Sequence, residues 1–364
     1  MKLTMNAEKL KDMVSRSVKG VGNNKLIPIT TLMAIEVKDN KLTLITTDAT
    51  NYLYIIEDKV IADDFYVVVD ANTFSKLISK MTCENITLEV RTDVYMLQVK
   101  GNGNYKIELP LDEDGQPIKY PDPYSNLTEV QDAGTINRST IQVILETIKP
   151  SLATTLENPC YTGYYMGDCV VATDSYKIAS MNVKLLEEAK LISPELLDLL
   201  AVMNTEKIKV DIIDNDVVYS TPDCIICGKF MEGIEEFAID AIVELLNSEF
   251  DSFCSVPKNT LLQLLDRLAL FVGPYDKNAV FLTFTPNGLQ VSSKAANGVE
   301  IIDYVASDNF TDFTCAIDIQ MFVQEIKAIQ SDVIEIYYGD ENAIKMKDGN
   351  ITIIVALLED DDME

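Results

Sequence analysis

The feature that most constrains this chain is a hairpin-like stretch that occurs three times, at spacings of about 120 residues. In each copy, two arms of alternating apolar residues are joined through Asp, Asn or Gly, the residues that tight hairpin turns prefer. The first arms are 32–40, 161–168 and 279–288, and the second arms are 41–49, 168–175 and 288–295. This repeated pattern predicts antiparallel sheets that recur along the chain.

Two helical patterns accompany each hairpin in the same order. The early helices are predicted within 6–19, 136–149 and 256–272, and the later ones within 67–81, 190–203 and 315–329. The later helices each follow a residue that suits an N-cap, and these are Asp70, Ser193 and Asp318. A strand should then follow each later helix, at 83–90, 205–212 and 331–338.

The repeats predict an α+β protein of three tandem domains, each with two helices and about eight strands packed as antiparallel sheets. We place these domains at 1–124, 125–247 and 248–364. A stretch rich in proline and acidic residues, 110–127, marks the first boundary, whereas the second lies somewhere within 236–253.

The composition excludes several kinds of chemistry. The 364 residues carry a net charge of −28 and contain no histidine, which removes the usual Ser/His/Asp and Cys/His catalytic groups and the commonest zinc ligand. The close pair Cys224 and Cys227 lies in an apolar, strand-like run, which favours buried thiols over a metal or redox site. The acidic run 112–114 is best interpreted as a solvated loop, so we expect no metal and no cofactor.

The first residues carry charges throughout, and the chain contains no apolar stretch as long as a membrane span. With seven cysteines, an odd number, we expect reduced thiols, a cytoplasmic location and no membrane partner.

One stretch, VVATDSYKIAS at 170–180, combines residue types that could be catalytic. Ser175, Tyr176 and Lys177 are adjacent, however, and adjacent residues of a strand point to opposite faces, so the three side chains cannot converge. A nucleophilic enzyme is therefore the weaker interpretation.

The same stretch resembles the Thr-Asp-Gly-His-Arg-Leu-Ala segment of bacterial sliding clamps, the beta subunits of the replicative DNA polymerase. The three repeats, the opening MKLTM and the apolar ITIIVALL near the end extend the resemblance over essentially the whole chain. Thr173, Asp174, Ile178 and Ala179 match the segment, whereas Ser175 replaces Gly, Tyr176 replaces His and Lys177 replaces Arg. These departures and the added acidic tail 359–364 would suit a plasmid, phage or lineage-specific clamp.

The resemblance implies a homodimeric ring, closed head to tail, that encircles double-stranded DNA and catalyses no reaction. The replicative DNA polymerase and the clamp loader would bind it through short peptides. The implied peptide pocket consists of Tyr161, Thr173, Ser175, Tyr176, Lys177, Ile178, Asp318, Met321, Ile353, Val355 and Leu357. The implied dimer interface consists of Tyr105 and Ile107 on an edge strand and Leu270 and Phe271 at a helix end.

The distribution of charge bears on DNA binding. The six helical segments total +3, which leaves −31 for the rest of the chain. Basic helices inside an acidic rim would meet the phosphates first, because salt screens charges beyond roughly 8 Å. The predicted DNA-facing residues are Lys9, Arg16, Lys19, Lys76, Lys80, Arg138, Lys149, Lys258, Arg267 and Lys327. The alternative is an acidic scaffold of the same fold that recruits proteins without encircling DNA.

Overall fold

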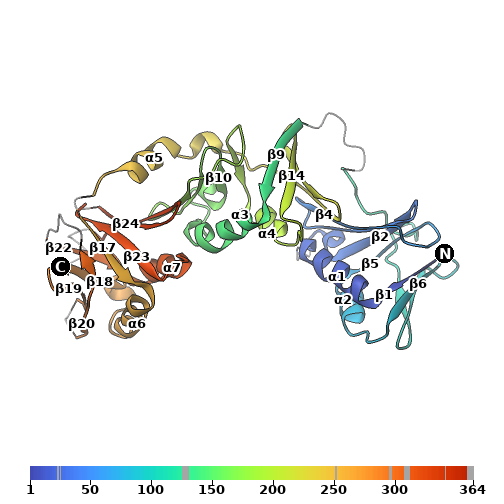
Figure 1. Ribbon diagram of the computed structural model, residues 1–364. Helices are drawn as coiled ribbons and strands as arrows, with labels where there is room; N and C mark the ends of the chain where they lie inside the picture. Colours follow the sequence, from blue (N-terminus) through green and yellow to red (C-terminus); the bar gives the residue numbers. More distant parts are fainter. Residues whose placement is uncertain are drawn as a thin grey trace. The chain divides into compact units, whose positions relative to one another are not determined.

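The computed structural model describes residues 1–22, 24, 26–124, 131–250, 252–294, 297–306, 312–340 and 342–358 (Figure 1). The order of its elements repeats three times: a strand, a helix, a group of strands, a second helix and three more strands. The predicted α+β class is therefore confirmed, with antiparallel pairing throughout the described sheets.

Compactness divides the chain into two units, and the first comprises 1–141 and 195–230. It contains an eight-stranded sheet in the order β5-β2-β3-β4-β16-β15-β14-β9 and a four-stranded sheet in the order β1-β6-β7-β8. The strands are β1 Lys2–Asn6, β2 Leu32–Lys38, β3 Lys41–Thr47, β4 Tyr52–Asp58, β5 Phe65–Asp70, β6 Asn85–Arg91, β7 Met96–Lys100, β8 Asn104–Glu108, β9 Gln131–Asn137, β14 Lys207–Ile213, β15 Asp216–Thr221 and β16 Cys224–Lys229. The helices are α1 Ala7–Ser17 and α2 Ala71–Ser79, and the division crosses α3 Arg138–Val143 and α4 Pro194–Leu200.

The second unit comprises 142–194 and 231–364. It contains a nine-stranded sheet in the order β13-β10-β11-β12-β25-β24-β23-β17-β21 and a four-stranded sheet in the order β20-β19-β18-β22. The strands are β10 Tyr164–Met166, β11 Val170–Thr173, β12 Lys177–Met181, β13 Lys190–Ile192, β17 Ser252–Pro257, β18 Ala279–Thr285, β19 Gly288–Ser293, β20 Val299–Ile302, β21 Val305–Ala306, β22 Phe313–Asp318, β23 Val333–Tyr338, β24 Ala343–Asp348 and β25 Ile351–Ala356. The helices are α5 Ile239–Asn247, α6 Lys258–Leu268 and α7 Ile319–Ala328.

The helices form where amphipathic periods meet capping residues. Asp70 accepts a hydrogen bond from the Thr73 amide at the start of α2, and Asp318 accepts bonds from two amides at the start of α7, as predicted. Ser193 directly precedes α4. On α6, the buried side chains follow the expected helical period and form its core face; they are Leu261, Leu264, Leu265 and Leu268.

Of three local differences from the predicted elements, only the strand placement of Tyr161 is an error. The helix within 136–149 is α-helical only as far as Val143 and continues as a π-helical turn over Ile144–Ile148. Tyr161 lies in a short 3₁₀ helix, Pro159–Thr162, and not on a strand. Within the region 236–253, where the second domain boundary is predicted, Ile239–Asn247 form the helix α5, whose apolar residues recur at helical spacing.

The strands of the predicted middle domain divide between the two large sheets, because β9, β14, β15 and β16 pair in one and β10 to β13 in the other. A division by compactness therefore cuts through 125–247, and the three domain boundaries stay a prediction. Among the described residues, none of the helices has the length and apolar character to cross a membrane.

Candidate functional site

The stretch that resembles a clamp segment forms the hairpin between β11 and β12 in the second unit. Thr173 pairs with Ile178, and the Asp174 carboxylate accepts hydrogen bonds from the amides of Tyr176 (3.0 Å) and Lys177 (2.9 Å). Ser175 has a φ of 79°, in the left-handed region that favours glycine. The clamp segment that this stretch resembles has Gly at this position, and Gly is the residue that adopts such a φ most readily.

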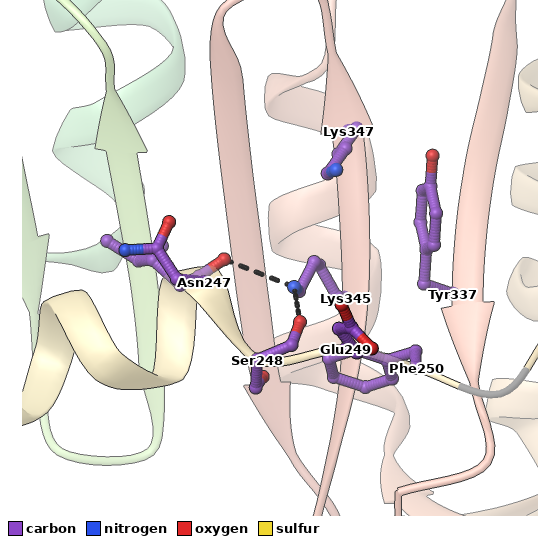
Figure 2. A pocket seen from close by; sticks show the side chains of 8 residues that line it. Asn247, Ser248, Glu249, Phe250, Tyr337, Lys345 and Lys347 are labelled. Carbon is purple, nitrogen blue, oxygen red and sulfur yellow. Dashed lines mark hydrogen bonds between the residues drawn. The ribbon is translucent and has the colours of Figure 1, made fainter.

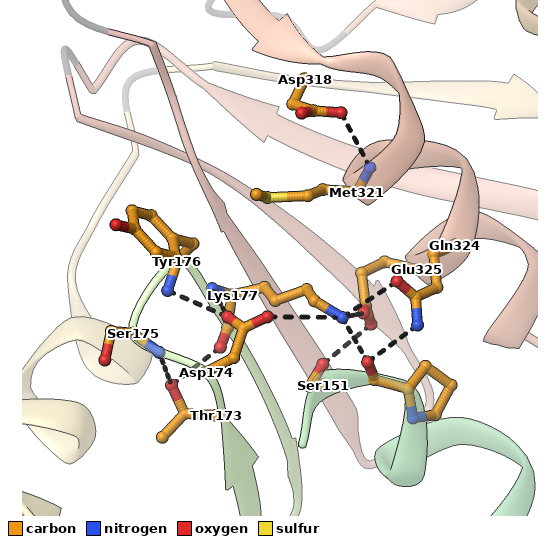
Figure 3. A network of polar contacts seen from close by, with 11 residues as sticks. Ser151, Thr173, Asp174, Ser175, Tyr176, Lys177, Asp318, Met321, Gln324 and Glu325 are labelled. Carbon is orange, nitrogen blue, oxygen red and sulfur yellow. Dashed lines mark hydrogen bonds and ion pairs between the residues drawn. The ribbon is translucent and has the colours of Figure 1, made fainter. Parts of the chain in front are cut away.

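Lys177 was predicted to line the peptide pocket, but its charged group is buried and does not face a pocket. Its side chain is only 5% exposed, and Nζ donates to Glu325 Oε1 at 3.0 Å and to Gln324 Oε1 at 3.2 Å (Figure 3). The carbonyl of Pro150 accepts a further hydrogen bond from the same ammonium. Because its ammonium group is buried and bound to these acceptors, Lys177 places no charge at the surface.

Glu325, on α7, was not predicted to be functional. Its carboxylate is fully buried, and Oε2 accepts a hydrogen bond from Ser151 Oγ at 3.0 Å. Burial raises the pKa of Glu325, and the adjacent Lys177 ammonium opposes that rise. No sequence pattern could have found this pair, because its two residues are separated by 148 positions.

The predicted pocket residues Ile178, Ile353 and Val355 do not share one face of the nine-stranded sheet. Ile178 pairs with Ile354, whereas Lys177 pairs with Val355. Paired residues share a face and neighbours along a strand do not, so Val355 and Ile353 lie on the face of Lys177, away from Ile178. The residue that shares the face of Ile178 is Ile354.

Ile178 and Ile354 belong to a cluster of buried residues beneath α5, which we call the outer cluster. Its buried members are Cys160, Val171, Ile178, Leu191, Phe237, Ile242, Ala343 and Ile354. Tyr161 packs at its edge, with its ring 5.2 Å from that of Phe237 in an edge-to-face contact. The sequence analysis missed Phe237, Ile242 and Ile354. The helical spacing of the apolar residues in Ile239–Asn247 was a signal for Ile242, because it indicates a helix with one buried face.

The remaining predicted pocket residues lie around the same turn and strand end. Tyr176 is 63% exposed, and its carbonyl accepts a hydrogen bond from the Ala356 amide at 2.8 Å. Leu357 and Met321 are half-buried. Asp318 is committed to capping α7, which removes it as a free pocket group.

The structure gives no support to catalysis by these residues. In the described part of the chain, no hydrogen bond joins the hydroxyl groups of Ser175 or Tyr176 to the Lys177 ammonium, which is bound as described above. Burial raises the pKa of Cys224 and of Cys227 to about 12, so both are inert core thiols as predicted. No group of three or more metal-binding side chains forms among the residues that were placed.

The ten predicted DNA-facing cations divide by their contacts. Arg16 is buried and donates to the Val202 carbonyl and to Asp223 Oδ2 at 2.7 Å, so it cannot face DNA. Lys258 binds backbone carbonyls at the end of α7, and that prediction is also wrong.

Other members of the set are exposed but already neutralised. Lys9 pairs with Glu57 at 2.6 Å, and Arg267 forms a two-pronged pair with Glu300, with Nε to Oε1 at 2.8 Å. Arg138 and Lys149 are half-buried. Within the predicted set, the exposed lysines whose ammonium groups form no ion pair or hydrogen bond with other described residues are Lys19, Lys76, Lys80 and Lys327.

The predicted dimer interface is exposed in part. β8 is an edge strand, and its Tyr105 is 40% exposed, but Ile107 is 7% exposed and already packed within its own unit. In the second unit, Leu270 and Phe271 follow α6 and are 82% and 51% exposed.

A pocket of about 380 Å³ lies at the end of α5 (Figure 2). There the buried Lys345 donates to the carbonyls of Leu246 and Ser248, and its ammonium lies 4.6 Å from the centre of the Phe250 ring. Burial lowers the pKa of Lys345. This lysine fastens the C-terminal end of α5 to β24, which helps to keep the outer cluster covered.

Comparison with known proteins identifies the fold that these elements form. Residues 1–116 match the family model of the DNA polymerase III beta subunit, N-terminal domain. Among solved structures, the sliding clamp of Bacillus subtilis DNA polymerase matches with a TM-score of 0.83 and 17% identity over 99% of both chains. The chain has the fold of a bacterial DNA polymerase sliding clamp.

Two further clamps agree with this result. The beta subunit of Streptococcus pyogenes DNA polymerase matches with a TM-score of 0.84 and 16% identity, over 99% of this chain and 100% of that one. The DNA polymerase III beta subunit of Thermotoga maritima gives 0.82 and 17%, over 98% and 99%. No curated protein matches the sequence. The clamp fold recognised from the sequence is thus confirmed across the whole chain at low identity.

Proposed function

We propose that the chain is a sliding clamp, in which two copies close head to tail around double-stranded DNA and tether a replicative DNA polymerase and its clamp loader. The observation that carries the proposal is the clamp fold over the full length of the chain. A ring acts by topology, because it cannot leave DNA sideways, so it needs only weak phosphate contacts and no catalytic group. Three domains with boundaries at 124 and 247 and a cytoplasmic location are part of the same proposal.

Charge and exposure are consistent with this function. The free lysines Lys19, Lys76, Lys80 and Lys327 lie on or next to helices, the elements expected to face DNA. The exposed apolar side chains of Leu270 and Phe271 suit a contact that dimerisation would bury.

For partner binding we propose a revised pocket. Its apolar wall is the edge of the outer cluster, with Tyr161, Ile178 and Ile354, and its rim is the turn that carries Ser175 and Tyr176. Short peptides with apolar anchors such as Leu and Phe fit such a wall. With few buried anchors, the dissociation constant should be roughly micromolar, which is about −8 kcal/mol.

The test combines mass and topology. Sedimentation should give a dimer, and protein loaded by a clamp loader onto nicked circular DNA should remain bound until the circle is linearised. Retention that survives linearisation would show side-on binding and contradict encirclement. A dimer that binds polymerase peptides but is never retained on circles would favour the acidic scaffold.

A further inference from the structure

We propose that Lys177 and Glu325 are positioning residues for partner binding: their buried ion pair holds the turn at Asp174–Tyr176 against α7 and thereby sets peptide affinity. The inference rests on the proposed function, in which this turn forms the rim of the pocket. Neither residue would touch the peptide.

A continuous series of contacts connects the turn to the helix. Asp174 Oδ1 accepts the amides of Tyr176 and Lys177, and Oδ2 of the same carboxylate lies 3.7 Å from Lys177 Nζ. Lys177 Nζ in turn binds Glu325 Oε1 at 3.0 Å (Figure 3). The backbone of the turn is thus linked through two carboxylates and one ammonium to α7.

A third segment closes the network. Ser151 Oγ donates to Glu325 Oε2, and the Pro150 carbonyl accepts from both Lys177 Nζ and Gln324 Nε2. Pro150 and Ser151 belong to the short 3₁₀ helix Lys149–Ser151. The ion pair therefore fixes three segments relative to one another: β12, α7 and this short helix.

Stability alone does not account for a buried ion pair. Removing two charges from water is costly, and apolar residues of similar volume often serve the fold as well or better. What the charged pair adds is a defined geometry, since the ammonium and carboxylate must meet at particular positions. The turn needs such support because Ser175 holds a left-handed φ of 79° without being glycine.

The proposal is tested with Glu325→Gln, with Lys177→Met and with the double variant Lys177→Met/Glu325→Leu, which replaces the pair by apolar side chains. Lys347→Met is the matched control, because Lys347 is an exposed lysine on β24 outside the network. The readouts are the dissociation constant of a fluorescent peptide ending in Leu-Phe, the melting temperature, and amide hydrogen exchange over residues 173–178.

We expect both single variants to weaken peptide binding about tenfold and to speed exchange in the turn, with the control unchanged. The double variant should recover the melting temperature while its peptide affinity stays low. Wild-type affinity in every variant, or affinity that recovers in step with the melting temperature, would overturn the proposal and leave the pair a purely structural one.

Failure of the proposed function would look different. If the wild-type protein does not bind the peptide, partner binding at this turn is refuted, and the exchange data still decide whether the pair holds the turn. Should a single variant fail to fold, Ser151→Ala removes only one hydrogen bond to Glu325 and should show the same effects more weakly. Unchanged exchange in that folded variant and in the double variant would also refute the positioning role.

Discussion

Ile354 and Val355 are neighbours in β25, and their replacement by alanine should separate partner binding from stability. Both side chains are buried, with exposures of 4% and 0%. Ile354 shares the face of Ile178 in the outer cluster, whereas Val355 lies on the face of Lys177. Each substitution leaves a cavity, but only one of the two cavities adjoins the proposed pocket.

The magnitudes follow from the groups removed. Ile354→Ala should cost about 2–4 kcal/mol of unfolding free energy, as buried Ile-to-Ala changes usually do. Val355→Ala removes two methyl groups, worth about 1.6 kcal/mol in transfer energy plus a cavity cost. Only Ile354→Ala should also weaken the peptide, by roughly tenfold or more, because a buried anchor loses its wall.

The assay measures melting temperature and peptide affinity for both variants at a temperature where each is folded. Loss of binding in Val355→Ala together with normal binding in Ile354→Ala would refute the face assignment and reinstate the pocket first expected from the sequence. Equal loss in both would show that affinity simply follows stability.

Three further outcomes are expected. Leu270→Asp should give folded monomers by sedimentation, since this side chain is exposed in the single chain, and a dimer at micromolar concentration would contradict the interface. Ile107→Asp should instead lower the melting temperature, because it places a charge at a buried position. Lys76→Glu combined with Lys80→Glu should reduce retention on circular DNA and leave dimerisation intact, and unchanged retention at moderate salt would remove these residues from the DNA-facing surface. The pKa of Glu325 is raised, so the folded protein holds this proton to higher pH than the unfolded chain does. The stability that the protonated carboxyl contributes is therefore present below the ordinary pKa of 4.5 and lost as pH rises through the raised pKa. This fall in melting temperature with pH should disappear in Glu325→Gln.

The repeated fold could be predicted from the sequence because each of its signals is local. Alternating hairpin arms, capping residues and helical periods each act over a few residues, and Asp70 and Asp318 cap their helices as expected. Helix α5 was missed for a different reason: its region was assigned to a domain boundary, so the helical spacing of its apolar residues was not interpreted.

The pocket was predicted less well because strand faces alternate with every residue. The resemblance puts Ile178 and Val355 in one pocket, but the partner of Ile178 is Ile354. A difference of one position along a strand moves a side chain to the other face of the sheet. Register between β12 and β25 depends on pairing across more than 170 residues, which no local pattern encodes.

Charge counted by element has a similar weakness, and Arg16 and Lys76 show why. Both lie on helices and were assigned to the DNA-facing surface, yet Arg16 is buried against Asp223 while Lys76 is exposed. Arg16 follows Met13 by three residues on α1, so the helical period turns it toward the same buried side, and its partner lies 207 positions away. A cation that already neutralises a carboxylate adds little to the field that a phosphate meets. The attraction for DNA should therefore come from fewer lysines than the count of +3 suggested, and weak attraction is what a ring that must slide requires.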